Sequence, residues 1–201
     1  MTSARRILDR ITKKEEGWVF TPSDFLDLGT PHAVGMTLLR LAQNGKIRKV
    51  ARGLYERPRQ HPKLGFLSPA PDAIANALTG RDRLRLQPSG AYAANLLHLS
   101  EQVPAKITYL TDASPRVVRV GKQTIRLNKA SPRRMAAAGR TSGLVFEALR
   151  YLGRNHVTPE RVAQLQKLLS AEDRRLLLED LRLAPVWMHP ILREISKAPT
   201  P

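Results

Sequence analysis

Few residues in this sequence have the types and spacing that catalysis needs. The chain contains no cysteine, which excludes thiolate nucleophiles, disulfide bonds, zinc ribbons and iron–sulfur sites. Its histidines show no metal-ligand spacing, and the sequence has no phosphate-binding loop or dinucleotide fingerprint. These histidines are His32, His61, His98, His156 and His189. We therefore expect a protein that is not an enzyme and uses no metal or other cofactor.

Two aspartates remain as candidates for metal-dependent chemistry. Asp72 follows Pro71 at the start of an expected helix, and Asp112 comes at the end of an apparent strand. A metal-dependent nuclease needs clustered carboxylates to hold its cation. The Pro71-Asp72 pair is not followed by a Glu-x-Lys sequence, and an aspartate such as Asp112 is typical of a turn. A nucleic-acid-processing enzyme that uses these aspartates is the alternative hypothesis.

Positive charge is the stronger functional signal. The 201 residues include 34 lysines and arginines against 17 acidic residues, for a formal charge of +17. Residues 1–60 and 61–140 carry most of this excess, whereas residues 141–201 are nearly neutral. Positions 40–59 alone hold seven basic residues and one acid. A concentration of this kind favours a nucleic-acid partner over a basic surface that binds nothing.

The first sixty residues have the element order of a winged helix-turn-helix. Apolar residues at helical spacing predict an amphipathic helix over 4–14, followed by a short extended stretch over 17–20. A Thr-Pro-Ser-Asp cap predicts a short helix over 21–28, and a second proline-led cap predicts a helix over 30–44. The very short connection between these two helices is typical of a helix-turn-helix.

The second of these helices and the hairpin after it would form the DNA contact. Strands expected over 46–50 and 54–57 form a basic hairpin, the wing, with Gly53 at the left-handed position of a three-residue turn. The helix would enter the major groove, while the hairpin would neutralise phosphates. The DNA-binding residues expected here are His32, Ala33, Met36, Thr37, Arg40, Lys46, Arg48, Lys49 and Arg52. A helical bundle with a basic hairpin, or a winged helix used for protein contacts, are the alternatives.

Residues 61–140 predict a mixed α/β domain. Helices are expected over 71–80 and 90–99, the latter capped by Pro88-Ser89, and strands over 83–87, 106–111, 116–120 and 123–127. The last two strands form a hairpin across a Gly121-Lys122 turn, with arginines on one face. That face is either simply solvated or a second nucleic-acid surface. The candidate residues of this second basic surface are Arg116, Arg119, Arg126, Arg133 and Arg134.

Residues 141–201 predict leucine-rich helices that pack on the second domain, or that present one face to a partner protein. We therefore expect an α+β chain: a winged helix-turn-helix at 1–60, a mixed α/β domain at 61–140 and a C-terminal helical segment at 141–201. No apolar run approaches the roughly 20 residues that cross a bilayer. We expect a cytoplasmic protein with no membrane partner.

Several runs of this sequence resemble one family of regulators. Residues 20–25, 33–44 and 45–55 are similar to the winged-helix domain of AbiEi-type antitoxins, the transcriptional regulators of bacterial type IV toxin–antitoxin (abortive infection) systems. The wing sequence that ends in Arg52-Gly53-Leu54-Tyr55 is the most specific part. Residues 86–97 and 108–111 resemble the continuation in the shorter members of that family, so that the resemblance covers about residues 4–135.

The resemblance implies a double-stranded DNA partner and a toxin. In such a protein the N-terminal domain binds inverted repeats in its own promoter and represses it. The C-terminal domain is needed to counteract a nucleotidyltransferase-like toxin encoded alongside, typically without a stable complex. An RNA-binding accessory protein is a further alternative, which a preference for structured RNA over duplex DNA would identify.

Overall fold

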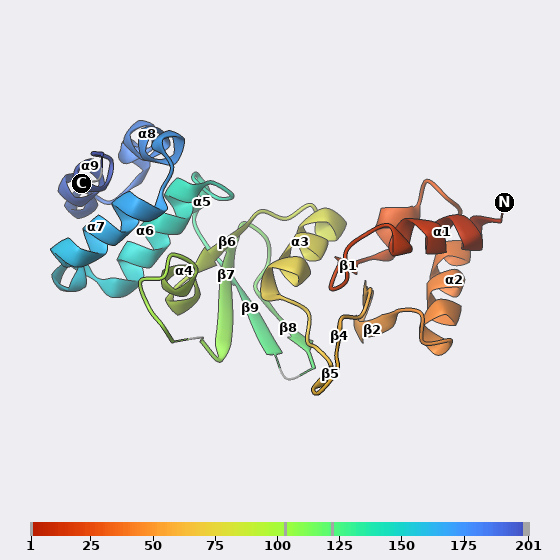
Figure 1. Cartoon of the computed structure of the whole chain (residues 1–201). Helices are drawn as coiled ribbons and strands as arrows, with labels where there is room; N and C mark the ends of the chain where they lie inside the picture. The colour runs from red at the N-terminus through yellow and green to blue at the C-terminus, as the bar shows by residue number, and fades with distance from the viewer. Residues whose placement is uncertain (1, 103, 122, 199–201) are drawn as a thin grey trace. The chain divides into compact units, whose positions relative to one another are not determined.

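The computed structural model describes residues 2–102, 104–121 and 123–198, and within them the chain has a mixed α/β architecture (Figure 1). This architecture is compatible with the expected α+β class. The helices are α1 (Ser3–Thr12), α2 (Pro31–Gln43), α3 (Pro71–Asp82), α4 (Ala91–Leu96), α5 (Pro132–Met135), α6 (Thr141–Leu152), α7 (Pro159–Leu168), α8 (Ala171–Glu179) and α9 (His189–Ile195). Short 3-10 helices are η1 (Pro22–Phe25), η2 (Arg154–His156), η3 (Leu181–Leu183) and η4 (Val186–Met188).

The strands are short, and in the described residues they form three separate sheets. They are β1 (Val19–Phe20), β2 (Arg48–Ala51), β3 (Leu54–Glu56), β4 (Gln60–His61), β5 (Gly65–Phe66), β6 (Leu86–Ser89), β7 (Lys106–Thr111), β8 (Arg116–Val120) and β9 (Gln123–Lys129). The sheet orders are β1-β3-β2, β4-β5 and β6-β7-β9-β8. Lys122, in the expected turn between β8 and β9, lies outside the described residues.

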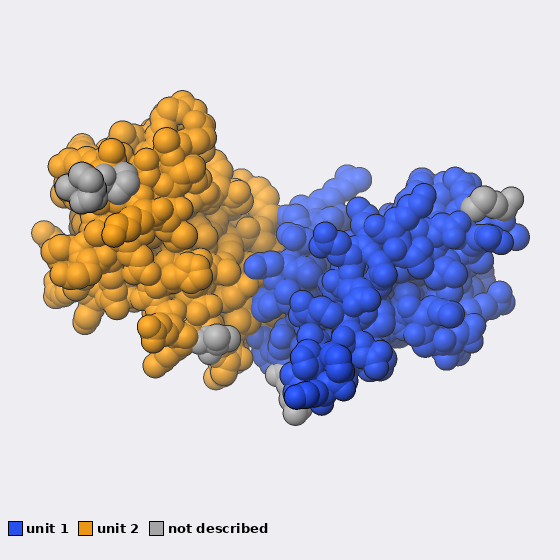
Figure 2. All heavy atoms as spheres, viewed as in Figure 1, with its two compact units in different colours: residues 1–84, 118–124 blue, residues 85–117, 125–201 orange. Residues whose placement is uncertain are grey.

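The chain divides into two compact units (Figure 2). Unit 1 comprises residues 1–84 and 118–124, and unit 2 comprises residues 85–117 and 125–201. The boundary that we expected after residue 60 therefore falls inside unit 1, because α3 packs against β1 and η1. The helices after residue 140 share unit 2 with β6 and α4.

The elements from α1 to β3 in unit 1 share a hydrophobic core. Ile7 and Ile11, one turn apart on α1, are buried there with Phe20, Phe25 and residues of α2. The segment after Thr21 is the four-residue helix η1 instead of the longer helix that we predicted. Its tight turn is closed by the Asp24 carboxylate, which accepts hydrogen bonds from the Thr21 amide and hydroxyl, and it allows Phe25 and Leu28 to be buried together.

The predicted basic hairpin is present as β2 and β3, with a different turn. Ala51 pairs with Leu54, so the turn has two residues, Arg52 and Gly53, and not three. Gly53 has a φ of 69°, which confirms the left-handed position predicted for it. A register shift between Lys49 and Ala51 marks an irregularity in β2.

The boundaries of α3 also differ from the prediction. The helix continues past Gly80, where we expected it to end, and stops at Asp82. Arg83 then takes the left-handed conformation, with a φ of 51°. A glycine in a helix interior is tolerated at a cost of about 1 kcal/mol, so Gly80 alone does not end this helix.

Unit 2 corrects our assignment of Pro88 and Ser89. Both belong to strand β6, which pairs antiparallel with β7, and Gly90 with a φ of 64° leads into α4. Proline is compatible with β6 because this strand lies at the edge of its sheet. The Ser89 hydroxyl, instead of capping a helix, donates a 2.8 Å hydrogen bond to the buried carboxylate of Glu147.

The helices of unit 2 form the second core, in which α6 contacts α4, β6 and α8. At its start α6 approaches other backbone so closely that a Cβ on Gly143 would collide with the carbonyl of Ala137. Among the residues that the structure describes, no helix is both long and apolar enough to span a bilayer.

Candidate nucleic-acid interface

Helix α2 is anchored on one face and exposed on the other. Thr30 caps it by accepting a hydrogen bond from the Ala33 amide, and Val34 and Leu38 are buried in the unit 1 core. Because residues at helical spacing share a face, the opposite side projects into solvent. The expected contact residues that are exposed on this side are His32, Ala33, Met36 and Arg40.

Thr37, the fifth residue expected on α2, is only partly available. Its side chain is half-buried, and its hydroxyl donates a 2.8 Å hydrogen bond to the carbonyl oxygen of Ala33 within the same helix. A threonine hydroxyl has one proton to donate. Thr37 can therefore act toward a bound base as an acceptor only.

Three of the four cations expected on the hairpin are exposed. Lys46 precedes β2, Lys49 lies on β2 and Arg52 occupies the turn. The side chain of Arg81, on α3, lies behind this turn and donates a 3.4 Å hydrogen bond to the Arg52 carbonyl. The hairpin is thus supported from α3 while its own cations face solvent.

Arg48 has a different role from its neighbours. It forms an ion pair with Glu56, directly opposite on β3, and donates a 2.6 Å hydrogen bond to the Leu67 carbonyl. Glu56 is only 1% exposed. Burial raises the pKa of Glu56, and the charge and hydrogen bond of Arg48 oppose that effect without overcoming it. Arg48 is consequently a structural residue, and we remove it from the contact residues expected on the hairpin.

The end of α2 and the strand β2 border one hollow. It has a volume of about 370 Å³ and is lined by Gln43 near the end of α2, by Lys49 on β2 and by Phe66 on β5, among other residues. The exposed helix and the basic hairpin are therefore adjoining parts of unit 1, and not separate features of the chain.

The second basic surface is only partly supported. Arg119 and Arg126 are exposed, as the alternation along β8 and β9 predicted, and Arg133 is exposed as well. Arg116 is half-buried. Arg134 corrects the prediction, because its guanidinium donates hydrogen bonds of 2.8 and 2.5 Å to the two carboxylate oxygens of Glu147. This pairing inside unit 2 withdraws Arg134 from any nucleic-acid surface.

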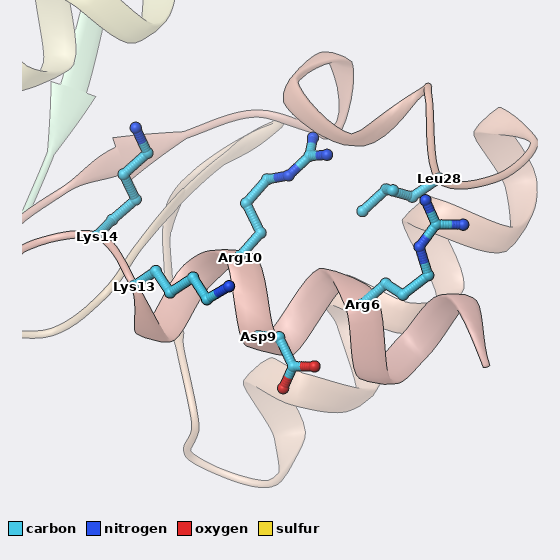
Figure 3. A pocket seen from close by; sticks show the side chains of 6 residues that line it. All are labelled: Arg6, Asp9, Arg10, Lys13, Lys14 and Leu28. Atoms are coloured by element: carbon cyan, nitrogen blue, oxygen red, sulfur yellow. The ribbon is translucent and has the colours of Figure 1, made fainter. Parts of the chain in front are cut away.

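A second concentration of charge lies along α1, for which we predicted no binding role. A hollow of about 570 Å³ is lined by Arg6, Arg10, Lys13 and Lys14, with Asp9 and Leu28 (Figure 3). Arg10 is neutralised by Asp27, to which it donates hydrogen bonds of 2.8 and 2.6 Å.

The two aspartates considered for metal chemistry lie in different surroundings. Asp112 accepts a 2.8 Å hydrogen bond from Arg85, and this bond lowers the pKa of its carboxyl group. Asp72 is in the first turn of α3, in the other compact unit. The described residues contain no group of three or more histidines and acids that could hold a metal ion.

Sequence reasoning missed one hairpin beside this interface. Strands β4 and β5 pair through His61 and Gly65, in a stretch for which we predicted no helix or strand. The signal was present in the sequence: Pro62 and Gly65 flank Lys63 and Leu64, as in a three-residue turn that ends on a left-handed glycine.

A family model described as "Family of unknown function (DUF6088)" matches residues 6–177. This range includes residues of both compact units. A search of curated proteins found no match for the chain.

Proposed function

Because the chain belongs to this family of unknown function, its activity has to be inferred from its own residues, and we propose that it is a DNA-binding transcriptional repressor of the antitoxin type. In this proposal the elements from α1 to β3 are a winged helix-turn-helix. Helix α2 enters the major groove, and the hairpin β2–β3 is the wing that holds the phosphates.

One observation carries the proposal. An anchored helix exposes His32, Met36 and Arg40, and it adjoins a hairpin whose Lys49 and Arg52 are exposed and form no ion pair among the described residues. Cations on a hairpin suit the phosphate backbone, whereas a polar helix face of this length suits base edges. The sheet order β1-β3-β2 gives the hairpin a third strand to rest on.

The antitoxin part of the proposal rests on the family resemblance. We propose that the protein represses its own promoter by binding inverted repeats there, and that it counteracts a nucleotidyltransferase-like toxin without forming a stable complex with it. A reading frame beside its gene that encodes such a toxin would give this part a direct test, by growth of cells that express the toxin with and without the protein.

The DNA-binding part is tested by the salt dependence of duplex binding. Removing three phosphate contacts with Lys46→Ala, Lys49→Ala and Arg52→Ala should lower the slope of log affinity against log salt by about 3. Fluorescence anisotropy with duplex from upstream of the gene measures this slope. The matched control removes the same charge from unit 2, with Lys167→Ala, Arg182→Ala and Arg193→Ala, which are exposed.

The two variants separate specific contacts from general attraction. We expect the control variant to keep the slope of the natural protein. Equal slopes for the two variants would show that net charge alone attracts DNA, and the wing assignment would then be wrong. Preferential binding to structured RNA in a competition assay would replace duplex DNA by RNA as the partner.

A further inference from the structure

The hairpin β4–β5 exposes apolar side chains at its tip and base. Leu64, in the turn, is 72% exposed, and Phe66, on β5, is 56% exposed. Every residue from 59 to 66 is exposed. Two large apolar side chains on a small projecting hairpin are unusual for a surface that contacts only water.

The turn that carries Leu64 is held in one conformation. The ring nitrogen Nδ1 of His61 accepts hydrogen bonds of 3.2 and 3.3 Å from the amides of Lys63 and Leu64. Gly65 completes the turn with a φ of 70°, a conformation that side-chain-bearing residues rarely adopt. Because the backbone is fixed in this way, Leu64 is presented outward at little further cost in conformational entropy.

The base of the hairpin is attached to the proposed wing. The Arg48 guanidinium lies over the Phe66 ring, 5.5 Å from its centroid, and also binds the Leu67 carbonyl just beyond β5. Phe66 lines the same hollow as Gln43 of α2 and Lys49 of β2. Strands β4 and β5 accordingly lie beside β2 (Figure 1).

The charge around the tip identifies the kind of partner. Arg59 and Lys63 are exposed on either side of His61, and residues 57–66 include no acid. A second copy of this basic chain would be repelled by these cations, whereas the phosphates that border a DNA groove would be attracted. Apolar residues flanked by cations are the combination with which proteins wedge into the minor groove.

We propose that the β4–β5 hairpin is a second wing, which lies on the minor groove of duplex DNA and inserts Leu64 between base pairs. Lys63 and Arg59 bind the phosphates on the two sides of that groove. This inference rests on the proposed function, because it requires that α2 and β2–β3 bring the duplex to unit 1.

The test uses the full chain and a duplex with an aminopurine base, whose fluorescence rises when it is unstacked. Leu64→Ala should weaken binding by about tenfold and abolish the fluorescence rise, while the salt slope stays the same. Lys63→Ala should instead lower the salt slope by about 1. Leu178→Ala is the matched control, since Leu178 is a 46% exposed leucine on α8.

The outcomes separate this inference from the proposed function. If the natural protein binds no duplex, both fail. If it binds duplex and Leu64→Ala binds equally well, or aminopurine fluorescence does not rise on binding, only the second wing is wrong. A loss of self-association in the Leu64→Ala variant, measured by sedimentation, would assign the hairpin to contact between copies and would also overturn the inference.

Discussion

Each compact unit contains a buried glutamate paired with arginine, and the pKa values of the two glutamates are shifted in opposite directions. Glu56 in unit 1 pairs with Arg48 and also feels the charge of Arg59, but burial still raises its pKa. Glu147 in unit 2 is equally buried, but it accepts hydrogen bonds from Arg134 and Ser89 and lies beside Arg150. Burial acts to raise the pKa of Glu147, and these partners together reverse that effect and lower it. The hydrogen bonds from Arg134 and Ser89 thus accompany a pKa shift of Glu147 that is opposite to the shift of Glu56.

The cations of the two units also differ in the ion pairs that they form. Each unit contains 17 lysines and arginines, so the number of cations does not distinguish them. Ion pairs are formed in unit 1 by Arg10, Arg48 and Arg81, and in unit 2 by Arg85, Arg134, Arg140, Arg150, Arg175 and Lys197. The exposed cations of α2 and of the proposed wing form no ion pair among the described residues. The surface that we propose for DNA binding is therefore marked by exposed, unpaired cations, and not by a larger number of cations in its unit.

The largest expected loss of stability is confined to unit 2. Gly143→Ala would push a methyl group into the Ala137 carbonyl and to within 2.6 Å of the Gln87 side chain, and should lower the free energy of unfolding by about 3 kcal/mol. Urea unfolding measures the loss, and hydrogen exchange locates it. Gly80→Ala, on α3 with open space around it, should instead stabilise unit 1 by about 0.5–1 kcal/mol. A uniform loss of protection in both units after Gly143→Ala would show that they do not unfold separately.

A comparable loss of stability should follow from breaking the pair around Glu147. Arg134→Met removes two hydrogen bonds of 2.8 and 2.5 Å to the carboxylate and leaves its charge buried. The cost of losing one partner of a buried pair is about 3–5 kcal/mol, and we expect the lower end, because Ser89 and Arg150 remain. Adding Glu147→Gln to this variant removes the buried charge and should recover most of the stability. Failure of the double variant to recover would mean that packing of the Arg134 stem, and not charge, holds this site.

The two glutamates should also make the stability of their units change with pH in opposite directions. A lowered pKa means that Glu147 contributes stability above the ordinary range of glutamate, and that this contribution is lost as the pH falls through its folded-state pKa. Glu56, with its raised pKa, contributes most to the stability of unit 1 below the ordinary pKa range of glutamate. This contribution is lost as the pH rises through the raised pKa. Hydrogen exchange of each unit between acid and neutral pH measures both trends. Glu56→Gln and Glu147→Gln should each flatten the trend of its own unit, and identical trends in the two units would contradict the comparison.

The sequence predicted the elements that depend on local signals. Helix α2 begins and ends within a residue of its predicted bounds because Thr30-Pro31 and Gly45 mark its ends. The roles of Pro88 and Ser89 could not be predicted, because the same pair fits a helix cap and an edge strand. The hydrogen bond from Ser89 that accompanies the strand goes to Glu147, which is distant in the sequence. Arg48 and Lys49 likewise look equivalent in sequence, and only the partner across the hairpin separates them.

That separation leads to a prediction about two adjacent cations. Arg48→Met leaves Glu56 buried without its partner and should lower the stability of unit 1 by about 2–3 kcal/mol, with the salt slope of DNA binding unchanged. Lys49→Ala should leave stability within about 0.5 kcal/mol of the natural protein and lower the salt slope by about 1. Thermal unfolding and anisotropy titrations at several salt concentrations measure the two effects. If Arg48→Met lowered the slope and spared stability, the assignment of the two residues would have to be exchanged.

The smallest expected effects are on sequence preference along α2. Arg40→Ala removes the exposed guanidinium that suits a guanine edge, and should reduce discrimination among duplexes by about tenfold. Thr37→Val should change it by no more than about twofold, because the hydroxyl proton already binds the Ala33 carbonyl and the half-buried side chain keeps its shape. Selection from randomised duplexes, followed by sequencing, measures both preferences. A large shift for Thr37→Val would mean that this hydroxyl leaves the Ala33 carbonyl when DNA binds. Thr37, at the centre of the exposed face of α2, would then determine sequence preference instead of Arg40.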